Sequence, residues 1–290
     1  MLKNKFTLYS VAIVFMMTLL GGCSSNLVYN NLDWLVDWYI DDFVDLNKQQ
    51  KNKLDKRLSQ LLLWHRNQEL GQYQKLLVQL KSDVSHKKLS SDQWLKYMLA
   101  IRSHWLRTRD KVGIQLSQMA TELSANQVDD LFENMKVKNL DEEEEFNDQD
   151  AEDIQQEHFE NIFDTVKDQL GSVNALQEQA INVYMQQWQS TTLEYLAYNR
   201  RIQAAAKVIF ESNTFEKNQA EDLTRNLYQL LTHPQQYQTI ELQKMIESNR
   251  VLSSLLLQAI HASITPKQQS QLNDNIEEMI ELLEELIKGG

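Results

Sequence analysis

The chain has 290 residues and a formal net charge of −12 at pH 7, from 29 basic and 41 acidic side chains. This acidic balance repels polyanions, and no stripe of Lys and Arg with interleaved aromatic residues offsets it, so nucleic acid is not an expected partner. Only 7 Gly and 2 Pro are present, where average usage would give about 20 and about 15, so turns should be few and helices long.

The first 23 residues have the features of a bacterial lipoprotein signal. Lys3 and Lys5 precede an apolar run over residues 6–20, and two glycines stand directly before Cys23. The apolar run is shorter than the roughly 20 residues that a membrane-spanning helix needs. We therefore predict cleavage before Cys23 and lipidation of its thiol, with a plain export signal or a membrane anchor helix as the alternatives.

Cys23 is the only cysteine of the chain, so the exported body would contain no disulfide. Ser24 follows it, and a Ser at this place resembles the sorting signal for the outer membrane, whereas Asp resembles the retention signal for the inner membrane. We expect a palmitate-bearing protein that is anchored to the outer membrane and faces the periplasm. The predicted parts are a signal peptide (1–22), the lipidated Cys with a short tether (23–28) and a helical domain (29–290), with a front half (29–170) and a back half (171–290) as its expected subdivision.

The first helix expected after the tether, over residues 29–44, carries an unusual set of side chains. Asp33, Asp37 and Asp41 are spaced four apart and form one row, beside Trp34 and Trp38. We expect no metal here, because no loop supplies the further oxygen ligands that Ca²⁺ or Mg²⁺ requires. Two interpretations remain: a partner or membrane surface, or ion pairs with basic residues of the next helix, namely Lys51, Lys53, Lys56 and Arg57.

The tether is short, so the first helix should begin close to the membrane. Six residues from Cys23 to Tyr29 span at most about 20 Å at roughly 3.5 Å per residue. One hypothesis therefore places Tyr29, Trp34 and Trp38 near the lipid headgroups, where amphipathic rings are favoured. The competing and preferred hypothesis buries both indoles in the helical body.

A short signal recurs along the chain and predicts helix starts: an apolar residue, then Ser, Thr or Asn, then two residues and a Gln. In such a capping box, the first polar side chain accepts a hydrogen bond from the N3 amide, and the Gln side chain accepts one from the N-cap amide. The N-cap positions predicted in this way are Asn47, Ser90, Ser124, Thr232 and Thr265.

Apolar residues between these starts recur in steps of three, four and seven, as in the series Trp94, Met98, Ile101 and Trp105, and no window alternates cleanly with period two. We therefore predict an all-α fold, an elongated bundle of about eight mostly antiparallel long helices. The expected helices lie near residues 29–44, 48–82, 91–122, 125–169, 173–211, 215–231, 235–262 and 266–288.

Charge is concentrated in two places. The acidic run over residues 141–153 predicts a solvated, frayed stretch of a long helix, with a flexible hinge or a docking face for a basic partner as alternatives. Arg102, Arg107 and Arg109 form the main basic cluster. These cations are expected to neutralise carboxylates within the bundle, or else to bind an anionic glycan or a phosphate headgroup.

No catalytic, metal or cofactor signature is found, since G-x-S-x-G, a glycine-rich phosphate loop and H-E-x-x-H are all absent. His65 and His104 fall at or beside core-facing helix positions, where a lone His is usually a packing residue. Helical lipoproteins that cleave peptidoglycan carry Glu-Ser before a Gly-rich segment, but the Glu-Ser pairs at 211 and 247 have no Gly near them. We expect neither an enzyme nor a cofactor.

The residues from Tyr29 to Leu46, followed by Gln50, Leu54 and the run Leu63-Trp64-His65-Arg66, resemble a family of uncharacterised Gram-negative lipoproteins defined by a domain of unknown function. The resemblance runs from the lipoprotein signal at Cys23 to the C-terminus and is strongest over the first seventy residues. It implies lipoprotein status and a helical body, and it transfers no activity and no functional residue.

Three functional hypotheses follow in order of preference. The first is a lipid-anchored protein without enzymatic activity that binds an envelope protein or glycan through its front hairpin or its acidic helix. The second is a chaperone-like holdase, because the capping boxes resemble the Leu-Thr-x-x-Gln motif of small helical periplasmic stress chaperones. The third is a hydrolase acting on peptidoglycan.

Overall fold

The computed structural model describes residue 29 and residues 32–212 and 219–289. The predicted signal peptide, Cys23 and the tether lie outside the described residues. Within the described ranges the chain is almost entirely helical and contains no strand, so the predicted all-α class is confirmed. In this part of the chain, no helix combines the length and the apolar character needed to cross a bilayer.

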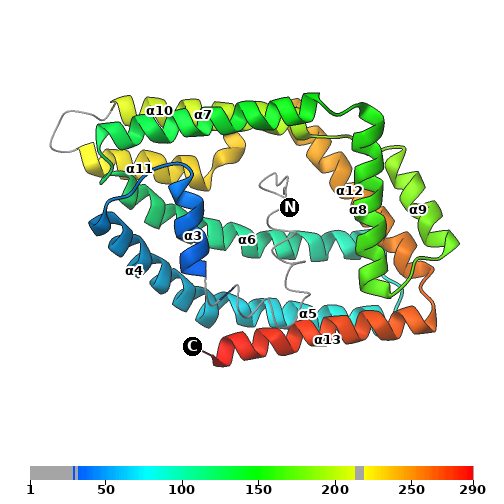
Figure 1. Ribbon diagram of the computed structural model, residues 1–290. Helices are drawn as coiled ribbons and strands as arrows, with labels where there is room; N and C mark the ends of the chain where they lie inside the picture. Colours follow the sequence, from blue (N-terminus) through cyan, green and yellow to red (C-terminus); the bar gives the residue numbers. More distant parts are fainter. Residues whose placement is uncertain (1–28, 30–31, 213–218, 290) are drawn as a thin grey trace.

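The helices form an extended packed arrangement (Figure 1). Along one edge α7 and α10 lie side by side, α5 and α13 run together along the opposite edge, and α6 passes between the two pairs. The elements are α3 (Leu32–Asp41), α4 (Lys48–Trp64), η2 (His65–Glu69), α5 (Leu70–His86), α6 (Ser91–Ala120), α7 (Ala125–Asn147), α8 (Ala151–Leu170), α9 (Ala175–Met185), α10 (Thr192–Ser212), α11 (Gln219–Thr232), η3 (Pro234–Tyr237), α12 (Ile240–Ala262) and α13 (Pro266–Lys288).

Separate apolar clusters hold the helix pairs together. The α5–α13 pair buries Leu77 and Val84 against Ile280 and Leu283, and each such side chain contributes roughly 1.5–3 kcal/mol when fully buried. A second cluster joins α8, α9 and α12. A third lies at the start of α4 and receives one face of α3. The apolar clusters lie between different sets of helices, so each helix packs mainly against the helices beside it.

Four of the five predicted capping boxes are present, at Asn47, Ser90, Ser124 and Thr265. The prediction at Thr232 was wrong. Thr232 is the last residue of α11, its side chain is buried, and its hydroxyl donates to the Tyr228 carbonyl. Pro234 then begins the 3₁₀ turn η3, so the next α-helix starts only after the N-cap Thr239.

A further capping box stands at Asn174, where Gln177 provides the second side chain. The sequence Val173-Asn174-Ala175-Leu176-Gln177 has the same pattern as the other boxes, so spacing alone predicts this cap. Gly171 precedes it with φ +74° and ends α8. Glycine adopts this left-handed conformation without strain, which makes it a common residue at the end of a helix.

Four of the five capping boxes in the described residues are joined in pairs by hydrogen bonds between their Gln side chains. At one pair of helix starts, the amide nitrogen of Gln50 donates to the side-chain oxygen of Gln127 at 3.0 Å and to the Glu122 carbonyl at 2.8 Å. The Gln127 amide donates in return to the Gln50 oxygen at 2.8 Å and to the Asp45 carbonyl at 2.7 Å. The first turns of α4 and α7 are thereby held side by side.

The same arrangement recurs at the starts of α9 and α13. Gln177 and Gln268 exchange side-chain hydrogen bonds of 3.2 and 2.9 Å, and Gln268 also donates to the Ser172 carbonyl at 2.9 Å. The two Gln side chains are 0% and 2% exposed. Since water does not reach them, these hydrogen bonds have no replacement if one partner is removed.

Two of the expected long helices are broken. Residues 148–150 separate α7 from α8, where the Asp150 side chain accepts from the Asp153 amide and caps the new helix. Residues 186–191 separate α9 from α10, and there Asn249 of α12 bonds both the amide and the carbonyl of Gln189. The acidic run therefore belongs to the end of α7, a short break and the first turn of α8.

We predict that Gln268→Ala lowers the free energy of unfolding by about 3 kcal/mol, because the buried amide nitrogen of Gln177 and the Ser172 carbonyl each lose the hydrogen bond that Gln268 supplies. Gln93→Ala is the matched control, since the Gln93 side chain bonds only its own N-cap amide at Ser90, and should cost no more than about 1 kcal/mol. Urea unfolding followed by circular dichroism measures both. Equal losses in the two variants would contradict the proposed role of the paired boxes.

Candidate functional site

The helix α3 presents two large indoles to solvent. Trp34 is 66% exposed and Trp38 is 59% exposed, and their spacing of four places both on one face. The preferred expectation that both indoles are buried is therefore wrong. Tyr29 behaves in the opposite way, because its side chain is only 3% exposed, so it does not share this surface.

The aspartates of α3 are only partly neutralised. The Lys51 ammonium lies 2.9 Å from Asp41 Oδ1, which confirms one of the expected ion pairs across the hairpin. Lys53 instead pairs with Glu122 of the loop before α7. Burial, followed by the nearby carboxylate of Asp55, raises the pKa of Asp37 above its ordinary value. In the described part of the chain, no group of three or more His, Cys, Asp or Glu side chains is arranged to hold a metal ion.

A buried polar cluster surrounds the π-helical turn η2, where one extra residue in the turn displaces the backbone register. The Tyr29 hydroxyl lies 3.1 Å from Nδ1 of His65. The Arg66 guanidinium stacks over the Tyr29 ring at 5.4 Å and donates to the Gly289 carbonyl at 2.9 Å. Tyr29 and Gly289, the residue after α13, are therefore both held by side chains of η2.

At the other end of the turn, Glu69 is 3% exposed and binds Arg107 through two hydrogen bonds of 2.8 and 3.0 Å. Nδ1 of His104 lies 3.0 Å from Oε2 of Glu69, and the His104 ring contacts Tyr73 at 4.4 Å. Burial alone would raise the pKa of Glu69, but the hydrogen bonds from Arg107 and His104 outweigh it and hold this pKa below its ordinary value. Since these polar groups bond one another, the cluster joins η2 to α6 in the interior of the fold.

The predicted anion-binding cluster is dispersed by these contacts. Arg107 is engaged by Glu69, and Arg109 pairs with its neighbour Asp110 at 2.8 Å. Arg102 is half-buried on the same helix, α6. Arg102 and Arg107 are five positions apart, so the two project from different faces of α6. The expected neutralisation of carboxylates describes Arg107 and Arg109 better than a shared anion site does.

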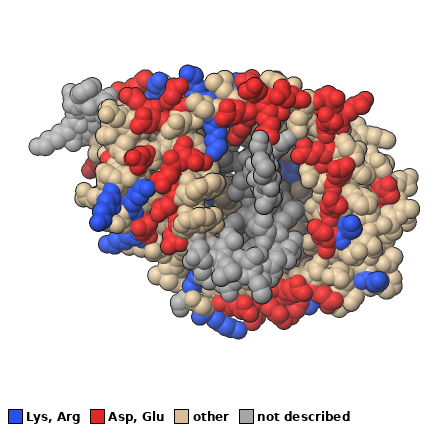
Figure 2. All heavy atoms as spheres, in the orientation of Figure 1, with Lys and Arg blue, Asp and Glu red and all other residues tan. Residues whose placement is uncertain are grey.

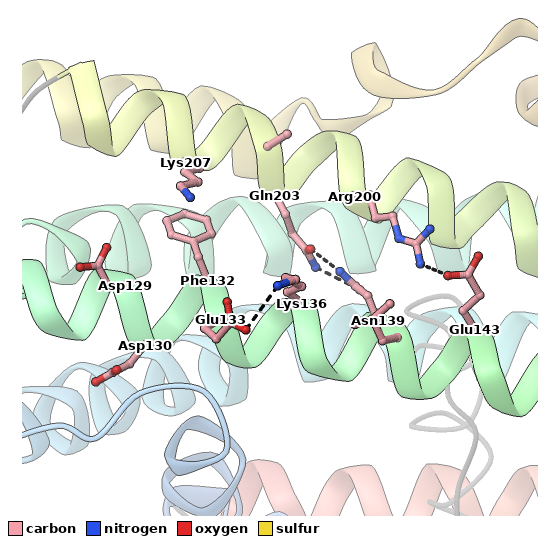
Figure 3. A pocket seen from close by; sticks show the side chains of 12 residues that line it. Asp129, Asp130, Phe132, Glu133, Lys136, Asn139, Glu143, Arg200, Gln203 and Lys207 are labelled. Carbon is pink, nitrogen blue, oxygen red and sulfur yellow. Dashed lines mark hydrogen bonds and ion pairs between the residues drawn. The ribbon is translucent and has the colours of Figure 1, made fainter.

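An open groove with a volume of about 620 Å³ runs along the pair formed by α7 and α10. Figure 3 shows the contacts that join its two sides: Asn139 and Gln203 exchange amide hydrogen bonds, and Arg200 pairs with Glu143. Side chains of both charges line the groove. They are Asp129, Asp130, Phe132, Glu133, Lys136, Asn139, Leu140, Glu143, Arg200, Gln203, Ala204 and Lys207.

The groove borders the acidic run, because Glu143 belongs to both. On the face of the molecule drawn in Figure 2, Asp and Glu side chains gather along the edge formed by α7 and α8, and again along α13. Burial raises the pKa of Glu142 above its ordinary value, against the effect of Lys138. The end of α7 is therefore structured and acidic.

Sequence reasoning missed Glu69 and the groove residues Asn139 and Gln203. A buried Glu one turn after a core-facing His is a weak signal for the π-turn cluster, and only the partner Arg107 from another helix makes it recognisable. The Asn139–Gln203 pair joins residues 64 positions apart, so no local pattern predicts it.

The chain matches the model of a family of unknown function (DUF6279) over residues 42–243. This match covers more than half of the chain, so the chain belongs to that family. The expected relationship to a family defined by a domain of unknown function is thereby confirmed. No curated protein and no solved structure matches the chain. The matched range contains the π turn and the groove and begins directly after α3.

We predict that the free energy of unfolding falls as the pH is lowered from about 6.5 to about 4. Burial lowers the pKa of His65 from 6.5 to about 4, so over this range the unfolded chain takes up a proton that the folded chain excludes. A shift of this size corresponds to a loss on the order of 3 kcal/mol. His158 contributes in the same direction, since burial also lowers its pKa to about 4.

His65→Asn keeps an amide near the Tyr29 hydroxyl and removes the titrating group. The slope of the unfolding free energy against pH should then decrease by about 1.4 kcal/mol per pH unit between the two pKa values, while the His158 contribution stays. Denaturant titrations at several pH values measure both slopes. An unchanged slope in the variant would show that His65 is not protected from protonation.

Proposed function

We propose that this chain is a lipoprotein that is anchored through Cys23 to the outer membrane, faces the periplasm, and binds another envelope component without catalysing a reaction. One observation carries the proposal. Tyr29 is almost completely buried only six residues after Cys23, so a lipid on that thiol would hold the body within about 20 Å of the bilayer.

The arrangement of the buried polar groups supports a structural or binding role. Glu69, Arg107 and His104 satisfy one another, and the capping-box Gln side chains are used in joining helices. In the described residues the polar groups with the deepest burial therefore hold the fold together. A body of this kind is suited to presenting a surface at a fixed distance from a membrane.

The surface that we assign to the envelope component is the groove between α7 and α10, together with the acidic end of α7. Phe132, Leu140 and Ala204 supply apolar contact between charged rims of both signs. A polyanion would meet the carboxylates of Asp129, Asp130 and Glu133. This mixed lining favours a polypeptide, which carries apolar and basic side chains, over an anionic glycan.

The holdase hypothesis loses its main support in this structure. Its sequence basis was the resemblance of the predicted capping boxes to the Leu-Thr-x-x-Gln motif of chaperones, and four of the five predicted boxes act as helix caps. The Gln side chains of three of these boxes, Gln50, Gln127 and Gln268, bond a Gln of a second helix start and so take part in helix packing.

The proposal is tested by placing a photo-crosslinking amino acid at Leu140 in intact cells. Leu140 is 52% exposed and lines the groove, so it should give a discrete adduct with one envelope protein. Leu176 of α9 is the matched control position, since it is 64% exposed and lies outside the groove, and it should give no such adduct.

Cys23→Ala in the same cells should move the protein from the membrane fraction to the soluble periplasmic fraction and reduce the Leu140 adduct, because the body is no longer held at the membrane. Ser24→Asp keeps the thiol and should redirect the protein to the inner membrane. A Cys23→Ala variant that stays in the outer-membrane fraction would disprove the anchor. Identical adducts from Leu140 and Leu176 would disprove the assignment of the groove.

A further inference from the structure

The exposed indoles of α3 do not line the groove between α7 and α10 that is assigned to the envelope component. Indoles are strongly buried on average, yet Trp34 and Trp38 are 66% and 59% exposed and lie one helical turn apart. The adjacent Tyr39 is 53% exposed as well. Tyr39 projects from another side of the helix, where its ring contacts Phe43 and Lys138. The exposed aromatic surface therefore consists of the two indoles, and such surfaces commonly mark an interaction site.

The orientation of α3 is fixed by its opposite face. Val36 and Ile40 pack against the cluster formed by Val44, Leu46 and Leu54. At the end of the helix, Asn134 of α7 donates to the Phe43 carbonyl at 3.0 Å. Because this apolar face is occupied by the body, the indole face cannot turn inward without breaking these contacts.

The position of α3 along the chain places its indoles near the proposed anchor. The chain is fixed to the π turn at Tyr29 by the His65 contact and the Arg66 stack, and α3 begins three residues later at Leu32. Ten helical residues extend only about 15 Å. A lipid at Cys23, six residues before Tyr29, would therefore bring the same part of the body to the bilayer surface.

The charges beside the indoles distinguish between headgroups. Asp33 and Asp37 each precede one of the two indoles, while Asp41 is already paired with Lys51. Carboxylates repel anionic phosphates at an uncompensated surface and accept hydrogen bonds from ammonium groups. A zwitterionic, amine-bearing lipid supplies those donors, whereas an anionic lipid without an amine does not.

We infer that the indole face of α3 docks on the bilayer surface, with Trp34 and Trp38 among the headgroups and with Asp33 and Asp37 accepting hydrogen bonds from ethanolamine ammonium groups. Indole rings favour this interfacial depth because one edge is apolar and the other donates a hydrogen bond. The inference rests on the proposed anchoring at Cys23. It adds an orientation for the body and a class of lipid that the surface recognises.

The test is tryptophan fluorescence of the full protein on vesicles of phosphatidylethanolamine that is brominated near the headgroup end of its acyl chains. Trp34 and Trp38 are two of six tryptophans, so quenching of about a third of the emission is expected if all six emit equally and only these two reach the interface. The variant Trp34→Phe with Trp38→Phe should lose this quenching. The control Trp105→Phe with Trp188→Phe should keep it.

Failure of the anchor and failure of the docking are separated by the mode of attachment. If the protein does not float with the vesicles, it is attached through a maleimide-bearing lipid, which reacts only with Cys23 because no other cysteine is present. Quenching that appears only after this attachment would refute natural lipidation and retain the docking. Attached protein with no quenching, or with equal quenching in the Trp34/Trp38 variant, would overturn the docking.

The headgroup assignment is tested on vesicles of phosphatidylethanolamine, phosphatidylcholine and phosphatidylglycerol that carry the same bromines. Quenching should be largest on phosphatidylethanolamine, since phosphatidylcholine has no N–H donor and phosphatidylglycerol is anionic. Asp33→Asn with Asp37→Asn should abolish this preference, and Asp41→Asn should retain it because Lys51 already occupies that carboxylate. Equal quenching on all three lipids would overturn the role of the ammonium groups.

Discussion

The arrangement of this protein depends on hydrogen bonds between capping boxes that meet in pairs. Two adjacent helix N-termini carry partial positive charges that repel each other, and a buried pair of starts is stable only if its amides find acceptors. In both pairs a Gln oxygen satisfies the cap of its own helix, and at least one Gln nitrogen donates to a carbonyl before the other helix. The Gln side chains that cap their own helices therefore also join helices that are far apart in the sequence.

The helices joined in this way position two outer surfaces, which are the groove between α7 and α10 and the indole face of α3. The pair at Gln50 and Gln127 lies at the start of α7, whose length forms one side of the groove with α10. The π turn fixes the chain at Tyr29 and leaves α3 with its apolar face packed and its indoles exposed. The body therefore presents a polar groove and an aromatic helix from one connected set of helices, and anchoring at Cys23 would give each a defined relation to the membrane.

Much of the fold could be predicted from sequence, because capping and apolar periodicity are local. The caps at Asn47, Ser90, Ser124 and Thr265 follow from spacing alone. The helix breaks could not be predicted in the same way, since the segment at Gln189 is held by Asn249 from another helix. The exposure of Trp34 and Trp38 was predicted wrongly for a related reason: indoles are usually buried, and which face of α3 packs is decided by Val44 and Leu54.

Anchoring at Cys23 is the claim on which both surfaces depend for their place in the envelope. Intact-mass spectrometry of the protein extracted from its native membrane tests it most directly. The expected product begins at Cys23 and carries the added mass of a diacylglyceryl group and an amide-linked acyl chain. A product with an unmodified cysteine, or one that retains residues 1–22, would contradict the account.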